Sequence, residues 1–157
     1  MSRLDTLRPQ RWERAGRVVS TDPALIDAEA VQRYLAAGQQ SPGIPIEVVR
    51  EFVANSVNFG LFNGAPEAGA RMIGYARVVT DFAAFAYIRG QGSGSWLMDC
   101  IFAHPDLQDL RRWMLMCGER PVAWYKRYGF EEPGRPGFAL HRTDRGIYLR
   151  KAEPEPR

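Results

Sequence analysis

Cysteine and histidine are scarce in this chain of 157 residues, which contains two of each. Two cysteines, Cys100 and Cys117, cannot form the disulfide framework of a small secreted domain, so we expect a reducing, cytoplasmic location. Cys100 and His104 are four residues apart and would share one face of a helix. A metal site needs further ligands, and Cys117 and His141 lie at no recognised spacing from this pair. We therefore expect no metal, and we interpret Cys100 as a small core residue.

Long hydrophobic runs are also missing. No apolar segment approaches the roughly 20 residues that span a bilayer, and the N-terminus lacks the hydrophobic core of a signal peptide. Hydrophobic residues make up 45% of the chain and charged residues 25%, as in ordinary globular proteins. The length predicts a single domain over residues 1–157 with no membrane partner. Its charged, proline-containing ends, residues 1–15 and 152–157, are expected to be mobile.

The excess of positive charge is small, with a formal net charge of +3. Arg8, Arg11, Arg14 and Arg17 are spaced as a basic arm for nucleic acid would be. Acidic residues interrupt this arm, however, and no aromatic platform for stacking bases accompanies it. We therefore predict a solvated surface and no nucleic-acid partner. The small positive excess is compatible with an anionic small ligand.

Several common nucleotide-binding and hydrolase motifs are absent. A P-loop needs a lysine followed by serine or threonine at the end of its glycine loop, and none is present. The third glycine of a dinucleotide fingerprint would fall on Ser95. There is also no Gly-x-Ser-x-Gly nucleophile elbow. What the chain does contain is a different glycine-rich segment, Arg89-Gly90-Gln91-Gly92-Ser93-Gly94.

This glycine-rich segment stands between an expected strand and an expected helix. The apolar run Phe82–Ile88 precedes it, and Trp96-Leu97-Met98 follows as a first helical turn. Such a turn presents unpaired backbone N–H groups with the positive end of the helix dipole behind them, which together favour phosphate. Glycine allows the close approach of a ligand and an unusual φ. The segment therefore predicts a phosphate-binding turn, and a tight turn without a ligand is the alternative.

The spacing of this segment resembles a signature of the GNAT family of N-acetyltransferases. Arg89, Gly92 and Gly94 occupy the three defining places of Arg/Gln-x-x-Gly-x-Gly/Ala. A second resemblance follows at residues 125–130, where the family has a helix that ends in Tyr-x-x-x-Gly-Phe. Gly129 suits the left-handed residue after a helix, and Phe130 would begin the next strand and pack inward. The resemblance covers about residues 17–142.

The resemblance implies a cosubstrate, a reaction and a set of site residues. It implies acetyl transfer from acetyl-CoA to a primary amine of a small molecule or protein. Tyr125 would protonate the departing thiolate, and a core aromatic residue is the alternative reading of Tyr125. Glu47, Glu51 and Asp81 are candidate bases only because they lie near the ends of expected elements. The pyrophosphate of coenzyme A would lie on the predicted cofactor-binding residues, which are Arg89, Gly90, Gln91, Gly92, Ser93 and Gly94.

The resemblance also implies the fold class, an α/β (α+β) domain with a mixed, mostly antiparallel twisted sheet flanked by helices. Hydrophobic periodicity agrees with this order of elements. An N-cap acceptor followed by proline, Asp22-Pro23, predicts where the first helix begins. A further helix is predicted to carry Val48, Val49, Phe52 and Val53 on one face. Strands are predicted over residues 17–20, 57–62, 72–80, 113–117 and 138–142, and another helix over 96–103.

One departure from the family concerns the strand before the glycine-rich segment. In the family this strand is long, and its backbone N–H groups bind the pantetheine arm and polarise the thioester carbonyl. Here Phe82–Ile88 meets Arg89 directly, which predicts a shortened central strand. Two functions therefore stay open: an acetyltransferase, or a degenerate GNAT-fold protein that binds coenzyme A or a partner without efficient catalysis. In the second case another subunit, in a homodimer, would cover the seam of the shortened sheet.

Overall fold

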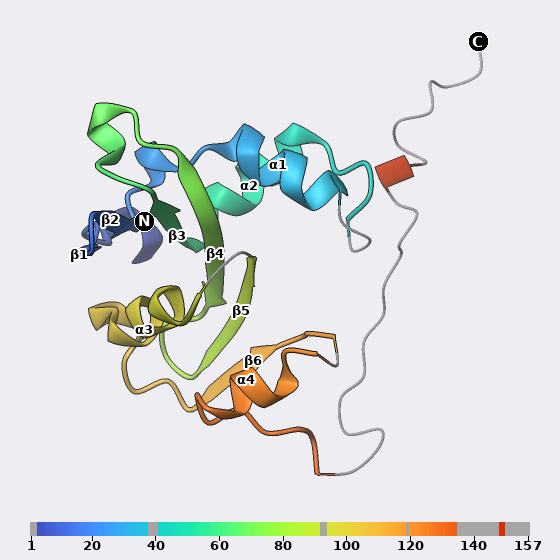
Figure 1. Cartoon of the computed structure of the whole chain (residues 1–157). Coiled ribbons are helices and arrows are strands. Elements are labelled where there is room, and N and C mark those ends of the chain that lie inside the picture. Colours follow the sequence, from blue (N-terminus) through green and yellow to red (C-terminus); the bar gives the residue numbers. More distant parts are fainter. Residues whose placement is uncertain (1–2, 38–40, 92–93, 119, 135–147, 150–157) are drawn as a thin grey trace.

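The computed structural model describes residues 3–37, 41–91, 94–118, 120–134 and 148–149 (Figure 1). Its centre is a six-stranded sheet in which the strands lie side by side in chain order. Neighbouring strands are antiparallel, except that β5 and β6 are parallel. The strands are β1 (Arg11–Arg14), β2 (Arg17–Ser20), β3 (Val57–Phe62), β4 (Met72–Thr80), β5 (Phe85–Gln91) and β6 (Arg112–Leu115).

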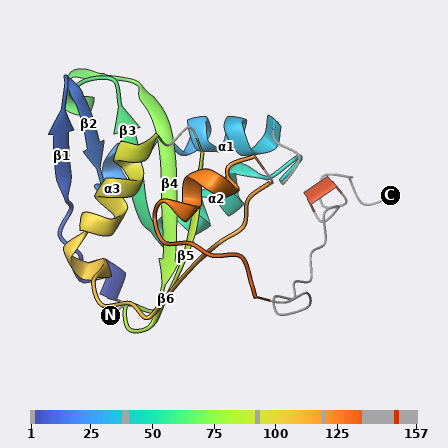
Figure 2. The same ribbon diagram turned by 60° about the horizontal axis from the view of Figure 1, so that its bottom comes forward.

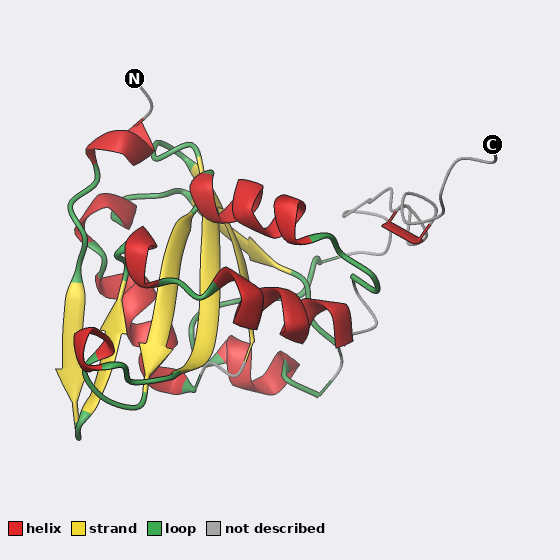
Figure 3. Cartoon of the chain, turned by 90° about the horizontal axis from the view of Figure 1, so that it is seen from above, coloured by secondary structure: helices red, strands yellow, loops and turns green. Residues whose placement is uncertain are grey.

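Helices cover both faces of this sheet (Figures 2 and 3). The described helices are α1 (Ala28–Ala37), α2 (Ile46–Ala54), α3 (Ser95–Ala103) and α4 (Val122–Lys126), with short 3-10 turns η1 (Arg3–Thr6), η2 (Pro23–Leu25), η3 (Pro66–Ala68) and η4 (Pro105–Leu107). The predicted fold class, a mostly antiparallel mixed sheet flanked by helices, is thus confirmed.

Two hydrophobic cores lie on opposite faces of the sheet because side chains alternate along each strand. On β4, Ala76 and Val78 are buried in the core that contains Leu97 and Ile101 of α3. Tyr75 on the same strand packs instead against the smaller core formed by α1 and α2. The segment β4 therefore separates an α3 side from an α1/α2 side.

The bounds of β2, β3 and β4 agree with the sequence prediction, whereas the first helix begins in two steps. Asp22 Oδ1 accepts a hydrogen bond from the Ala24 N–H at 2.9 Å and caps η2. The backbone is extended at Ile26, and Asp27 Oδ1 then accepts a hydrogen bond from the Ala30 N–H at 2.8 Å. Each aspartate thus begins its own turn of helix, and α1 starts later than the Asp22-Pro23 pair suggests.

Residues 3–15 belong to the N-terminal end for which the sequence predicts mobility. They contain η1 and β1, and β1 pairs with β2 from Arg11↔Ser20 to Arg14↔Arg17. The Trp12 ring packs against Phe59, with 6.2 Å between ring centroids. The segments 152–157 and 138–142 lie outside the described residues. No strand begins at Phe130 within residues 120–134.

The strand before α3 is displaced along the chain from its predicted position. Asp81 Oδ1 accepts hydrogen bonds from the N–H groups of Ala83, Ala84 and Phe85, so the residues after Asp81 form a turn instead of a strand. The strand β5 starts at Phe85 and continues to Gln91, paired with β4 as far as Tyr75↔Gln91. The first half of the glycine-rich segment is therefore strand, and the predicted turn is shorter than the sequence suggested.

None of the helices in the described part of the chain is long and apolar enough to cross a membrane.

Candidate functional site

A seam opens between the two parallel strands of the sheet. The strands β5 and β6 pair from Phe85↔Arg112 to Ile88↔Leu115. The strand β6 ends there, whereas β5 continues to Gln91, and the two ribbons diverge beyond this point (Figure 1). Within the described residues, no strand pairs with the edge of residues 89–91 that faces away from β4. This edge offers backbone hydrogen-bonding groups to a ligand.

The helix α3 begins just beyond this seam and has no side-chain cap. Gly94 is its N-cap residue and has no side chain to cap it, and the first turn contains no acidic residue. A Cβ atom at Gly94 would meet nothing within 4 Å, so the approach to the first N–H groups is open on this side. Unpaired donors at the positive end of a helix suit a phosphate. Gly92 and Ser93 lie outside the described residues.

The close packing of β4 against β5 explains why residue 90 is glycine. It lies directly opposite Ala76 in the register of β4 and β5. A Cβ atom at Gly90 would approach the Ala76 Cβ to 2.8 Å and the Ala76 Cα and Tyr75 carbonyl oxygen to 3.3 Å. A side chain would therefore push the two strands apart at the point where the seam opens.

Tyr125 lies on α4, half-buried within an aromatic cluster on the α3 side of the sheet. Its ring meets Trp124 edge to face at 4.7 Å and Phe130 at 5.9 Å between centroids. Burial, and secondarily the Cys117 thiol, raise the pKa of Tyr125. Its hydroxyl therefore keeps its proton at neutral pH, as a general acid requires. The ring also has the packing of a core aromatic residue, so both readings of Tyr125 stay open.

The three candidate bases lie away from any enclosed site. Asp81 is in the β4–β5 turn, and the N–H groups of Ala84, Ala83 and Phe85 lower the pKa of its carboxyl to about 2. A carboxylate with so low a pKa is a poor proton acceptor. Glu47 and Glu51 are exposed on α2. None of the three lines the cleft described below.

His104 and Cys100, the pair considered for a metal, are both buried in the core. His104 Nδ1 accepts a hydrogen bond from the Asp106 N–H at 3.2 Å and so caps η4. Within the described part of the chain, no group of three or more histidine, cysteine or acidic residues is arranged to hold a metal.

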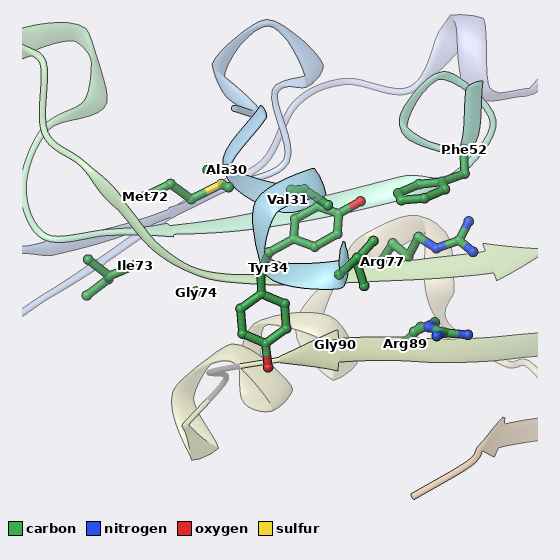
Figure 4. A pocket seen from close by; sticks show the side chains of 12 residues that line it. Ala30, Val31, Tyr34, Phe52, Met72, Ile73, Gly74, Arg77, Arg89 and Gly90 are labelled. Atoms are coloured by element: carbon green, nitrogen blue, oxygen red, sulfur yellow. The ribbon is translucent and has the colours of Figure 1, made fainter. Parts of the chain in front are cut away.

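A cleft that the sequence did not reveal lies on the α1/α2 side of β4 and β5 (Figure 4). Its volume is about 150 Å³. Phe52 of α2 lies against the Arg77 side chain, and Tyr34 of α1 and Arg89 of β5 also line the cleft. Gly90 also lines the cleft, which therefore adjoins the seam along β5. The other lining residues are Ala30, Val31, Leu35, Met72, Ile73, Gly74 and Tyr75.

Two arginines stand side by side on the strand wall of this cleft. Arg77 is directly opposite Arg89 in the β4–β5 register, and the Arg77 guanidinium lies 4.2 Å from the centroid of the Phe52 ring. Burial lowers the pKa of Arg77, and the charge of Arg89 lowers it further. Arg89 Nη2 makes a long contact of 3.5 Å with Ser41 Oγ. Arg89 was predicted from the sequence as a cofactor residue, yet its side chain lies on the cleft side of β5.

A buried hydrogen-bond network fixes the strand wall beneath the cleft. Tyr75 Oη donates to Asn58 Oδ1 at 2.6 Å, and Asn58 Nδ2 donates to the Val53 carbonyl oxygen at 2.7 Å. Burial raises the pKa of Tyr75. Tyr75 is therefore neutral, and its hydroxyl proton is held by Asn58.

Known proteins with this fold have an acetyltransferase description. A solved structure from Xanthomonas campestris pv. campestris, described as a "putative acetyltransferase belonging to the gnat family", is 35% identical to this chain. The match covers 84% of this chain and 96% of that protein, with a TM-score of 0.73. A Staphylococcus aureus protein described as a "Probable Acetyltransferase" has the same fold, with a TM-score of 0.59 at 20% identity and coverage of 82% and 98%.

A curated protein of Gibberella zeae, "Putative acetyltransferase FG08082", is 25% identical over 154 aligned positions, and the match covers 82% of this chain and 87% of that protein. No family model matches the chain. The sheet order, the position of α3 and these relatives together define an acetyltransferase fold. The chain belongs to the GNAT family of acetyltransferases.

Proposed function

We propose that this protein transfers the acetyl group of acetyl-CoA to a primary amine of a small molecule or protein. One observation carries the proposal: β5 extends beyond its last pair with β6 and leads to the uncapped N-terminus of α3. The open strand edge is suited to hydrogen bonding an extended amide-containing arm, and the helix N-terminus is suited to phosphates. Coenzyme A has both of these parts in that order.

Acetyl-CoA supplies a thioester, and the acceptor nitrogen forms a bond to its carbonyl carbon. The carbon–sulfur bond then breaks, and its electron pair goes to sulfur. The nitrogen loses a proton. Backbone groups alternate along an antiparallel strand, and those of Arg89 and Gln91 point toward β4, so the Gly90 N–H is the donor that we assign to the carbonyl oxygen. Tyr125 is the acid that we assign to the sulfur, since the raised pKa keeps its hydroxyl protonated.

The acceptor amine would approach from the arginine-lined cleft, because Arg89 and Gly90 border both the cleft and the seam. No carboxylate lines the cleft within the described residues. We therefore assign the amine proton to solvent water at the cleft instead of to Asp81, Glu47 or Glu51.

A second function is favoured by the same lack of a carboxylate and by the regular pairing of β4 and β5, which shows no register shift from Tyr75 to Thr80. A strand without a bulge directs fewer N–H groups at a thioester. On this reading the chain binds coenzyme A without efficient turnover.

One pair of measurements separates the two functions. Isothermal titration calorimetry with coenzyme A measures binding, and thiol release from acetyl-CoA with a panel of amines, checked by mass spectrometry of the acceptor, measures transfer. Binding together with acceptor-dependent thiol release supports the acetyltransferase. Binding without release on any amine supports the second function, and the absence of binding contradicts both.

A further inference from the structure

The cleft between α1, α2, β4 and β5 has a chemistry that acetyl transfer to a simple amine does not need. A plain alkylamine requires an apolar surface and carries a positive charge when protonated, so it would be repelled by arginines. The charged side chains that line the cleft are nevertheless those of Arg77 and Arg89, and both are positive.

We propose that the acceptor amine also carries an anionic oxygen group, a carboxylate or a phosphate, which Arg77 and Arg89 bind in this cleft. The assignment of an acceptor rests on the proposed acetyltransferase function, whereas the binding of the anion does not. Guanidinium groups present paired N–H donors that match such oxygens, and their bonds to them are stronger than neutral hydrogen bonds.

The first argument is the cost of placing these two arginines together. Residues directly opposite in an antiparallel pair have Cα atoms about 4.5–5.5 Å apart, and like charges at such positions destabilise a sheet. The charge of Arg89 is one reason for the lowered pKa of Arg77. An anion between the two guanidinium groups would turn this repulsion into attraction for both.

The second argument is that no carboxylate among the described residues pairs with Arg77. Among the described residues, the titratable groups that influence the pKa of Arg77 are Tyr75, Arg89, Tyr87 and Tyr148, and none of them is a carboxylic acid. Glu29 of α1 pairs with Arg50 at 2.8 Å.

The third argument is that Arg77 is held in position. Its half-buried guanidinium stacks on the Phe52 ring, and the ring face attracts the positive charge. The ring orients the guanidinium without consuming all its N–H donors. A charged group fixed in a partly desolvated cleft loses little freedom when it binds a ligand.

The remaining walls indicate the rest of the acceptor. Val31, Leu35, Met72 and the Tyr34 ring make up much of the apolar lining of the cleft. A cleft of about 150 Å³ lies below the roughly 300–1,000 Å³ of pockets for drug-sized ligands. The acceptor is therefore a small amine with a short apolar body and one anionic group, of the size and polarity of an apolar amino acid.

The binding test uses two probes of the same shape. Calorimetry compares 4-methylpentanoate, which is anionic, with 4-methylpentanamide, which is neutral. The transfer test uses three amines on one skeleton: 3-methylbutylamine, leucine and the phosphonate analogue of leucine. We expect the carboxylate probe to bind at least about tenfold more tightly than the amide, as a charge-assisted hydrogen bond predicts. Preference for leucine or for its phosphonate then identifies the anionic group.

Two variants and a control test whether Arg77 and Arg89 are the residues that bind the anion. Arg77→Gln and Arg89→Gln should each weaken carboxylate binding about tenfold or more. Arg77 is not one of the predicted cofactor-binding residues, so coenzyme A should bind to Arg77→Gln as it does to the native protein. Arg17→Gln, an exposed strand arginine outside the cleft, should change neither affinity. Circular dichroism melting checks that each variant is folded.

Equal binding of the carboxylate and the amide, or binding of neither, overturns the inference. So does a loss of coenzyme A affinity in Arg77→Gln as large as the loss of carboxylate affinity, because the arginines would then serve the cosubstrate. Failure of the acetyltransferase proposal looks different: thiol release would be absent while the carboxylate still binds with the expected dependence on Arg77.

Discussion

The two sides of β5 present binding surfaces of different kinds. On the edge toward β6, the seam and the start of α3 offer backbone N–H groups. On the face toward α1 and α2, the cleft offers the side chains of Arg77, Arg89, Phe52 and Tyr34. A backbone surface recognises the part of a ligand that is the same in every reaction, whereas a side-chain surface can change from protein to protein. The seam should therefore set the cosubstrate, and the cleft should set the acceptor.

The largest effect should come from the α3 side of the sheet, in Tyr125→Phe. This change keeps the ring and its packing on Trp124 and Phe130 but removes the phenolic proton. If Tyr125 is the acid, turnover in the thiol-release assay should fall about 100-fold, while the affinities for coenzyme A and for 4-methylpentanoate stay unchanged.

A parallel loss of thermal stability and coenzyme A affinity in Tyr125→Phe would instead identify a residue that packs the core. Tyr128→Phe is a matched control, since it removes the hydrogen bond from Tyr128 Oη to the Ser95 carbonyl oxygen at 3.1 Å on the same side of the sheet. It should leave turnover much closer to that of the native protein.

The next largest effect should come from Gly90→Ala. This change should affect both the seam and the cleft, because Gly90 borders both. The new Cβ atom would meet the Ala76 Cβ at 2.8 Å, with backbone atoms of Ala76 and Tyr75 close behind. Overpacking of this kind costs about 1–3 kcal/mol. We expect that loss in the free energy of unfolding measured by urea denaturation, together with weaker binding at both sites.

Two further substitutions test the cause. Ala76→Gly in the Gly90→Ala background removes the facing methyl group and should recover part of the stability. Gly118→Ala, where a Cβ atom meets nothing within 4 Å, should cost far less than Gly90→Ala. If all three single and double variants are equally stable, the close strand approach is not the reason for glycine at this position.

We expect Gly94→Asp to weaken the binding of coenzyme A at the seam without changing binding in the cleft. Aspartate is a good N-cap and should hold or raise the stability of α3, but its charge would repel phosphates at the helix N-terminus. Coenzyme A affinity should fall about tenfold or more, with less loss at high salt, and 4-methylpentanoate affinity should not change. Gly94→Asn, a neutral cap of the same shape, is the control; equal losses in both variants would contradict the phosphate assignment.

How well the sequence predicts each element depends on whether the interactions that fix it leave a pattern in the local sequence. The strands β2, β3 and β4 have apolar patterns and clear breaks at their ends, so their bounds agree with prediction. The strand β1 was missed because only Trp12 in Arg11–Arg14 is apolar. The start of β5 was missed because one side chain, Asp81, holds the N–H groups of an otherwise strand-like apolar run.

The two sites differ in the same way. The glycine-rich segment is contiguous, so a local pattern predicts the phosphate site, although Arg89–Gln91 prove to be strand. The cleft depends on Arg77 and Arg89, which become neighbours only through the register of β4 and β5. Neither residue has a distinctive sequence neighbourhood, and a one-residue change in register would place them on opposite faces.

The smallest effect should come from Asp81→Asn, at the end of β5 away from both sites. Hydrogen bonds from three N–H groups lower the pKa of Asp81 to about 2, below the roughly 3.9 of an unfolded aspartate. Its charge therefore stabilises the fold above about pH 4, and this contribution is lost as the pH falls toward 2. Asparagine keeps an acceptor oxygen but has no charge.

The melting temperature of Asp81→Asn should accordingly lie slightly below that of the native protein at pH 7, and the difference should shrink as the pH falls from 4 to 2. Affinities for coenzyme A and 4-methylpentanoate should be unchanged at pH 7, because the β4–β5 turn lies at the opposite end of β5 from Gln91. A difference in melting temperature that is the same at every pH would show that the charge of Asp81 contributes nothing. A fall in turnover beyond that of Arg17→Gln would return Asp81 to the list of candidate bases and require β5 to transmit its effect to the seam.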